Sequence, residues 1–416
     1  MEYKRKNGRI DINDAIDRGL IVYDEEETHG ARNNKFWFND YQWLYKDVDN
    51  LYSTFEDYAE LISYEIAKLL GMNCAEYDLA SYNGMRGVIT KSVVEKGKKI
   101  VSGTVLLNTV FDEYFVSRIV LNKKFKELLE RYSISSFEDL LSNKNSHIKK
   151  RFFEELIACY NQTCCTSNDF YLDANNEDMM KYLFEFCMDL DEVYNDNFTE
   201  MKNGILVSNN LYDIWNAVEI YCNISGYKVD TESFMKDLVD LFIFDIITSQ
   251  GDRHADNWSV IIDEETGELS LSGFYDNSGA LSLNRTKAIV NINDYVNRLE
   301  KEKNPGKRKG ILKRLQETIN HSFSGIKITP EDVLSRNKND ILLNSFIDYS
   351  EDSFIERLKS CVDILDDDAI NTIYRNIEEK TGEPVPEIVK TVSSSVIKNN
   401  ISKIKELLSA RRGMKL

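Results

Sequence analysis

The chain has 416 residues, of which 42% are apolar, enough for one large or two ordinary domains with a sizeable core. It contains only 19 Gly and 4 Pro, which excludes a collagen-like, proline-rich or long-linker architecture. The formal charge of −18 opposes non-specific attraction to phosphate backbones and to anionic lipid surfaces. The composition therefore favours a globular protein and carries no strong nucleic-acid or membrane signal.

The chain start, the longest apolar block and the cysteines all favour the cytoplasm. Residues 1–6 are charged and lack the apolar segment of a signal peptide, and the apolar block at 238–247 is too short to span a bilayer. The 7 cysteines are odd in number and none lies in a C-x-x-C pattern, which favours reduced thiols. We therefore expect a cytoplasmic protein, with signal-independent secretion as the open alternative.

The first hundred residues predict strands around one helix. Aromatic-rich runs at 35–38 and 43–46 flank Asn39-Asp40, a pattern typical of a β-hairpin. Apolar residues then recur at helical spacing from Phe55 to Leu70, and Gly71 marks the helix end. Short β-prone segments follow at 76–79, 87–90 and 100–101.

From about Thr104 the pattern turns helical, with one exception. Residues 258–262 and 269–274 flank a turn at 263–267 and predict a second hairpin. The tail at 282–416 is charged and helix-forming, and it either completes the large lobe or recognises a partner. We expect an α+β fold with a small strand-rich lobe at 1–95 and a large, mostly helical lobe at 96–416.

One segment carries the pattern of a chemical site. Residues 250–258 read Gln-Gly-Asp-Arg-His-Ala-Asp-Asn-Trp, and the far end of the second hairpin reads Tyr-Asp-Asn-Ser-Gly at 275–279. Phosphoryl transfer from a nucleotide needs a carboxylate to orient the attacking hydroxyl and hard oxygen ligands for Mg²⁺. Asp252 and Asn257 lie five residues apart on one loop, and the hairpin can bring Asp276 alongside them.

These two segments resemble the catalytic loop and the metal-binding segment of the HipA-like kinases, relatives of the phosphatidylinositol 3/4-kinases and, more distantly, of the protein kinases. The resemblance implies a two-lobed protein-kinase-like fold that uses ATP and Mg²⁺, with a catalytic loop at 250–258 and a metal-binding segment at 274–279. It implies that Asp252 is the catalytic base, that Asn257 and Asp276 bind the metal and nucleotide, and that His254 supports the loop or the transferring phosphate.

The resemblance extends to the first hairpin and the helix after it. It implies that Lys46, on the second strand, grips the nucleotide phosphates. The helix at 56–71 then supplies the glutamate that pairs with this lysine, and we expect Glu60 in this role, with Glu56 as the alternative. The linker between the lobes falls near 90–94, where Thr90 and Ser92 would meet the adenine.

The phosphate-covering loop departs from the kinase pattern. No G-x-G-x-x-G precedes Lys46, and the candidate loop is 28–33, with Gly30 and Arg32 as its nucleotide-binding residues. No G-x-x-x-x-G-K-[ST] occurs either, which excludes a Walker-type site.

The resemblance implies a kinase that transfers the γ-phosphate of ATP to Ser or Thr hydroxyls of a protein substrate, itself included. The alternatives are a lipid or small-molecule kinase of the same fold and a catalytically silent nucleotide-binding scaffold. A silent scaffold usually lacks the lysine, the base or the metal-binding Asp, and this chain has all three. Full-length HipA toxins carry an additional N-terminal subdomain that this chain lacks, so we do not expect an antitoxin partner.

Two further features have structural interpretations. Asp245 lies in the apolar helix before the catalytic loop, and burial would require a partner, which we expect to be the backbone of that loop. The basic run at 301–314 is interpreted as a solvated face, with docking of an acidic partner or RNA as the alternative.

Overall fold

The computed structural model describes residues 3–22, 35–48, 54–142, 146–163, 211–319 and 352–414, with a few residues between 180 and 188 and at 346–347. The chain divides into two compact units. The first comprises Met1–Val101, Asp230–Ile326 and Asn337–Leu416, and the second comprises Ser102–Val229 and Lys327–Arg336. The lobe boundary expected near residue 95 stays a prediction.

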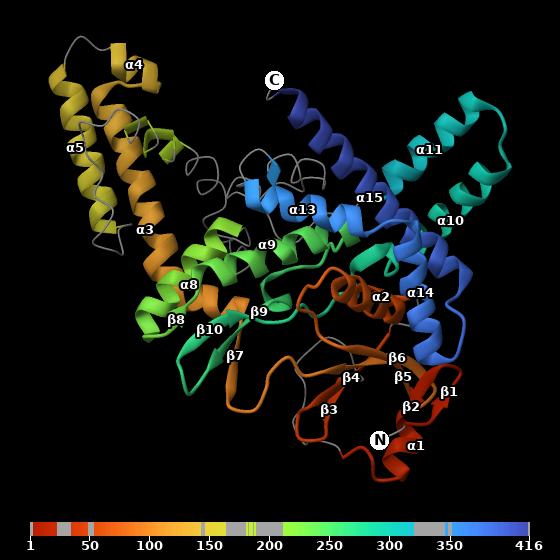
Figure 1. Ribbon diagram of the computed structural model, residues 1–416. Helices are drawn as coiled ribbons and strands as arrows, with labels where there is room; N and C mark the ends of the chain where they lie inside the picture. The colour runs from red at the N-terminus through yellow and green to blue at the C-terminus, as the bar shows by residue number, and fades with distance from the viewer. Residues whose placement is uncertain are drawn as a thin grey trace. The chain divides into compact units, whose positions relative to one another are not determined.

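A six-stranded sheet forms the amino-terminal part of the first unit, in the order β1-β2-β5-β6-β4-β3 (Figure 1). Its strands are β1 (Arg5–Lys6), β2 (Arg9–Asp11), β3 (Lys35–Phe38), β4 (Trp43–Asp47), β5 (Tyr77–Tyr82) and β6 (Met85–Lys91). The pairings are antiparallel except for β2 with β5. The first predicted hairpin is confirmed, because β3 and β4 pair with Phe38 opposite Trp43.

Two helices cover this sheet. The short α1 (Ile12–Asp17) begins at Asp11, whose side chain accepts a hydrogen bond from the amide of Asp14, a typical N-cap. The longer α2 (Glu56–Leu69) packs against β5 and β6 through a buried apolar face. Gly71 follows α2 with φ +66°, a left-handed conformation that favours glycine, so the predicted helix end is confirmed.

The second predicted hairpin follows a buried helix. The helix α9 (Thr231–Thr248) is almost wholly buried from Leu238 onward and leads through the 3₁₀ turn η2 (Ala255–Asn257) into the hairpin. The hairpin strands are β9 (Ser259–Asp263) and β10 (Glu268–Leu271), and β7 (Lys98–Ser102) lies next to β9. This succession places the expected catalytic loop between two well-packed elements.

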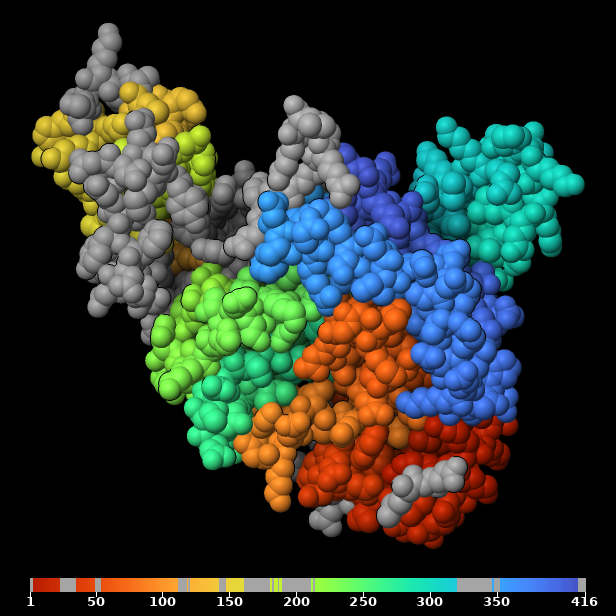
Figure 2. Space-filling view, viewed as in Figure 1, coloured from red at the N-terminus to blue at the C-terminus, as the bar shows by residue number. Residues whose placement is uncertain are grey.

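The tail is helical where it is described. It consists of η3 (Ala280–Ser282), α10 (Thr286–Lys301), α11 (Pro305–Ile319), α13 (Asp352–Ile364), α14 (Asp367–Thr381) and α15 (Glu387–Met414). Figure 2 shows the blue tail helices against the orange segment that contains α2, and α14 is the helix that packs on α2. In α15, the Asn400 side chain donates hydrogen bonds to the carbonyls of Ile246 (3.0 Å) and Ile247 (2.9 Å) at the end of α9. The tail is therefore part of the first unit's framework.

The second unit is mainly helical. Its elements are α3 (Gly103–Tyr132), α4 (Phe137–Ser142), α5 (Ser146–Thr163), α8 (Leu211–Ser225) and the short β8 (Lys228–Val229). Its core is rich in phenylalanine, and Phe125 packs edge-on against both Phe152 and Phe184. None of the described helices combines the length and the apolar character needed to cross a membrane.

Candidate active site

Lys46 joins three segments that are far apart in the sequence. Its ammonium on β4 lies 3.2 Å from Oε1 of Glu60 on α2 and 2.5 Å from Oδ1 of Asp276, which follows β10. The second carboxylate oxygen of Glu60 accepts a hydrogen bond from the backbone amide of Asn277 at 2.7 Å. Of the two glutamates expected near Lys46, Glu60 makes the contact.

Backbone contacts hold strand β4 and the expected metal-binding segment at 274–279 in place. Gly87 on β6 faces β4 so closely that a Cβ atom there would lie 2.5 Å from the carbonyl oxygen of Lys46, so only glycine fits. On the other side of the site, the Phe274 amide donates to the carbonyl of Asn73 (2.9 Å), and the Phe274 carbonyl accepts from the amide of Ala75 (2.8 Å). These bonds join the residue two positions before Asp276 to the segment between α2 and β5.

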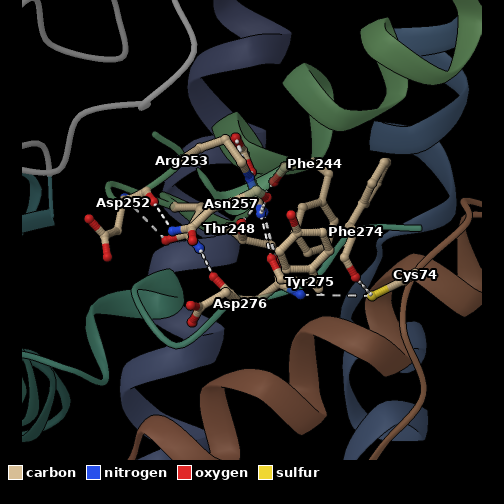
Figure 3. Close-up of polar contacts among 12 residues, drawn as sticks. Cys74, Phe244, Thr248, Asp252, Arg253, Asn257, Phe274, Tyr275 and Asp276 are labelled. Carbon is tan, nitrogen blue, oxygen red and sulfur yellow. Dashed lines mark hydrogen bonds and ion pairs between the residues drawn. The ribbon is translucent and has the colours of Figure 1, made fainter. Parts of the chain in front are cut away.

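The expected catalytic loop is a compact turn. The carbonyl of Asp252 accepts a hydrogen bond from the backbone amide of His254 (3.0 Å) and another from the side-chain amide of Asn257 (2.5 Å). The carboxylate of Asp252 is exposed, and Figure 3 shows it on the same side of the cluster as the carboxylate of Asp276. His254 is exposed as well, and its ring nitrogen Nδ1 accepts from the amide of Asp256 at 3.2 Å.

A buried glutamine bridges the loop and the metal-binding segment. Gln250 donates from Nε2 to the carbonyl of Asp276 (2.9 Å) and accepts through Oε1 from the amide of Asp252 (3.3 Å). Gly279 passes so close that a Cβ there would lie 2.4 Å from this Oε1 atom. The spacing between the two aspartates is thus fixed by one side chain and one glycine.

The Arg253 side chain also connects the same two segments. Its guanidinium donates to the carbonyls of Asn257 (2.9 Å) and Tyr275 (2.6 Å) and to the side-chain oxygen of Asn277 (2.6 Å). It also pairs with the carboxylate of Asp245 on α9 at 3.1 Å, and both side chains are 0% exposed. Asp245 therefore does have a partner on the catalytic loop, but the partner is this guanidinium and not the backbone that we expected.

The electrostatics of the two acids next to Lys46 differ. Burial raises the pKa of the Glu60 carboxyl above its usual range, although the Lys46 ammonium opposes this. Burial also acts to raise the pKa of the Asp276 carboxyl, but the attraction of Lys46 outweighs it and the pKa falls below the usual range. Asp276 is therefore ionised at neutral pH, the state in which a carboxylate can bind a metal ion.

The oxygen atoms of Asp276 and Asn257 are suitable ligands for Mg²⁺. Lys46 and the hydroxyl of Ser278 (3.1 Å) both contact Oδ1 of Asp276, and no hydrogen-bond donor within the described ranges contacts Oδ2. Asn257 uses its amide nitrogen on the carbonyl of Asp252, which leaves its amide oxygen as the atom suited to a cation. A carboxylate and an amide oxygen are the hard ligands that Mg²⁺ prefers.

The other expected nucleotide residues do not join this cluster. Thr90 pairs within β6 opposite Leu44 and Tyr77, and Ser92 donates from its amide to the carbonyl of Gln42 at 2.7 Å. Within the part of the chain that is described, no hydrogen bond links Thr90 or Ser92 to Lys46 or Asp276. Gly30 and Arg32 lie outside the described residues.

Several residues that support the site were not expected from the sequence. Tyr77 on β5 accepts a hydrogen bond from the Asp276 amide through its hydroxyl (3.0 Å), and no local pattern distinguishes it from a core tyrosine. Gln250, Arg253, Asn277 and Ser278 lie within or beside the two motifs, so their position in the sequence was the available signal.

Comparisons with known proteins support the fold. No protein-family model matches the sequence, and no curated protein matches it either. The crystal structure of CtkA, a proinflammatory kinase of Helicobacter pylori, aligns with a TM-score of 0.52 and 14% identity over 93% of this chain and 98% of that chain. The chain has a kinase-like α+β fold. The predicted fold class is thus confirmed, and the resemblance to kinases holds at the level of the fold.

A second alignment is weaker. HipA of Shewanella oneidensis MR-1, solved with HipB and its operator DNA, aligns with a TM-score of 0.38 and 11% identity over 95% of this chain and 72% of that chain.

Proposed function

We propose that this protein is an ATP- and Mg²⁺-dependent kinase that phosphorylates Ser or Thr hydroxyls of proteins, itself included. The observation that carries the proposal is the convergence of Lys46, Glu60 and Asp276, with the carboxylate of Asp252 on the same side of the cluster. Phosphoryl transfer depends mainly on positioning and on charge neutralisation, and these residues supply both.

Each residue has a role that follows from its surroundings. Lys46 is a cation on a rigid strand and would bind nucleotide phosphates, while Glu60 orients it from the neighbouring helix. Asp276 and Asn257 would hold Mg²⁺, which bridges and neutralises the phosphates when bound. Asp252 has an exposed carboxylate and would orient the attacking hydroxyl and accept its proton.

The proposal is tested by intact-mass spectrometry after incubation with ATP and Mg²⁺. We expect wild type to gain phosphate and Asp276→Asn to gain none. Asp252→Asn should retain nucleotide binding by calorimetry but lose turnover by about 10²- to 10⁴-fold, the usual contribution of a positioned acid–base group. Asp256→Asn is the matched control, because Asp256 is an exposed acid of the same loop whose side chain is 64% exposed.

Three results would contradict the proposal. Undiminished turnover of Asp252→Asn would show that Asp252 is not the residue that orients the attacking hydroxyl and accepts its proton. Transfer to inositides or sugars but not to proteins would identify a kinase of another substrate class. Metal-dependent nucleotide binding, with no transfer to protein, inositide or sugar hydroxyls, would identify a silent scaffold.

A further inference from the structure

The tail helix α14 forms hydrogen bonds with α2 and β5, two elements that hold residues of the site in place. From α14, the Lys380 ammonium donates to the backbone carbonyl of Tyr77 on β5 at 2.9 Å. One turn earlier, the Asn376 side chain donates to Oε2 of Glu65 on α2 at 3.3 Å. The Lys380 ammonium also lies 5.7 Å from the centre of the Tyr64 ring on α2, within the range of a cation–π contact.

Both of these elements are connected to Lys46, α2 through Glu60 and β5 through Asp276. Tyr77 is 2% exposed, and its hydroxyl receives the backbone N–H of Asp276. The helix α2 carries Glu60, which contacts both Lys46 and the amide of Asn277. The two carboxylates that contact Lys46 are thus both linked to α14. Asp276 is linked through Tyr77, and Glu60 is linked through helix α2.

Neutralising Asp78 does not explain the position of Lys380. The ammonium lies 3.6 Å from Asp78, but Arg5 already binds that carboxylate with two hydrogen bonds, at 3.1 and 2.8 Å. The contact specific to Lys380 is the carbonyl of Tyr77. Tyr77 and Thr90 of β6 form a non-hydrogen-bonded pair, because the adjacent Lys91 amide donates to the Glu76 carbonyl (3.0 Å). Strand β2 pairs with β5 only at Ala80 and Ser81, so the Tyr77 carbonyl receives its hydrogen bond from the tail.

We propose that α14 is a positioning element of the site and that Lys380 is a positioning residue, which acts through Tyr77 on Asp276. The physical basis is that phosphoryl transfer depends on ligand positions held to a fraction of an ångström, and that such positions need support from packed neighbours. Lys380 fixes the first residue of β5, the hydroxyl of Tyr77 fixes the Asp276 amide, and Asn376 fixes α2. The tail would then set the geometry of a site that it does not itself line.

The first test is hydrogen–deuterium exchange of the segment 274–279 in the full chain. Lys380→Met should increase the exchange rate of this segment about fivefold, the factor that one net hydrogen bond is worth. Tyr77→Phe keeps the ring but removes the acceptor of the Asp276 amide, and it should increase exchange at least as much. Lys380→Arg, which can still donate to the carbonyl, should behave as wild type.

The control is Lys390→Met. Lys390 on α15 pairs with Glu378 on α14 at 2.7 Å and is 27% exposed, whereas Lys380 is 28% exposed, so the two lysines differ mainly in what they hold. Lys390→Met should leave exchange in 274–279 unchanged. Equal exchange in Lys380→Met, Lys390→Met and wild type would overturn the proposal.

The second test measures ATP binding by calorimetry with and without Mg²⁺, and it rests on the proposed function. Lys380→Met should weaken the Mg²⁺-dependent part of the affinity about fivefold and leave metal-free binding unchanged, because the affected residue is Asp276. An equal loss in both conditions, or no loss, would contradict action through Asp276. If wild type bound no nucleotide, the proposed function would fail, and the exchange result would still decide the positioning role.

Discussion

Two ion pairs lie in the same site, and they differ in how far they are exposed to solvent. The pair of Asp245 and Arg253 is sealed, with both side chains 0% exposed and with the guanidinium also bonded to two backbone carbonyls and Asn277. The pair of Lys46 and Asp276 is open on one side, with side chains that are 13% and 35% exposed. The chemistry of the two pairs is similar, so the difference lies in what else the charges can reach.

The comparison separates charges that support the site from charges that can act in it. Arg253 donates to protein atoms and links the expected catalytic loop to the expected metal-binding segment. The ammonium of Lys46 and the carboxylate of Asp276 are partly exposed, so both can contact a ligand. The two carboxyls also differ in pKa. Burial raises the pKa of Asp245 to about 6, whereas Lys46 holds the pKa of Asp276 below its usual range.

The largest expected effect comes from breaking the sealed pair. Arg253→Met leaves the Asp245 carboxylate buried without its cation, and we expect a loss of about 3–5 kcal/mol in the free energy of unfolding. Urea denaturation followed by circular dichroism measures this loss. Arg298→Met is the control, because its pair with Asp294 is exposed (49% and 57%) and should contribute about 0–1 kcal/mol. Equal losses in the two variants would show that burial of the Asp245–Arg253 pair does not add to its contribution to stability.

Breaking the open pair should instead affect activity. Lys46→Met removes the cation that we propose binds the nucleotide phosphates, and we expect phosphate transfer to fall about 10²- to 10³-fold, as when one preorganised electrostatic contact is deleted. The loss of stability should be smaller than that of Arg253→Met, because the Asp276 side chain is 35% exposed and water can solvate its carboxylate when the ammonium is removed. Intact-mass kinetics and urea denaturation of the same preparations provide both values. A variant that unfolded as readily as Arg253→Met would show that Lys46 is a structural residue.

Local features of this site could be predicted from the sequence, and long-range ones could not. The two hairpins, the helix that ends at Gly71 and the loop at 250–258 have periodicity or turn residues that act within a few positions. Strands β1 and β2, with 2 and 3 residues, are too short for such a pattern.

The support of the site depends on pairs that no local pattern encodes. Tyr77 and Asp276 are 199 positions apart, and Tyr77 and Lys380 are 303 apart. The sequence indicated that Asp245 needs a partner, but complete burial of the Arg253 side chain beside it is visible only in three dimensions. The roles implied for Gly30 and Arg32 stay predictions.

The two pairs should also respond to pH with opposite sign. Asp245 has a folded-state pKa of about 6, above its unfolded value, so its contribution to stability is complete below about pH 4 and is lost as the pH rises through 6. Asp276 has a lowered folded-state pKa, so its contribution is present above about pH 4 and is lost as the pH falls further.

This difference in sign is measurable with two variants. The free energy of unfolding of wild type minus that of Asp245→Asn should fall between about pH 4 and 6, because the unfolded carboxyl ionises first. The corresponding difference for Asp276→Asn should be constant over that interval and should fall only at lower pH. Parallel curves for the two variants would mean that the pairs are electrostatically equivalent.

The smallest expected effect concerns Ser278, at the edge of the open pair. Its hydroxyl donates to Oδ1 of Asp276 at 3.1 Å, and Lys46 contacts the same oxygen. Ser278→Ala should therefore reduce phosphate transfer only about fivefold and leave the free energy of unfolding within about 1 kcal/mol of wild type, because the ion pair persists without the hydroxyl. Ser395→Ala, which removes a hydroxyl that donates to the Thr391 carbonyl within α15 (2.7 Å), is the control and should change neither value. A loss of activity as large as that of Lys46→Met would place the hydroxyl of Ser278 among the groups that contact the nucleotide or its metal.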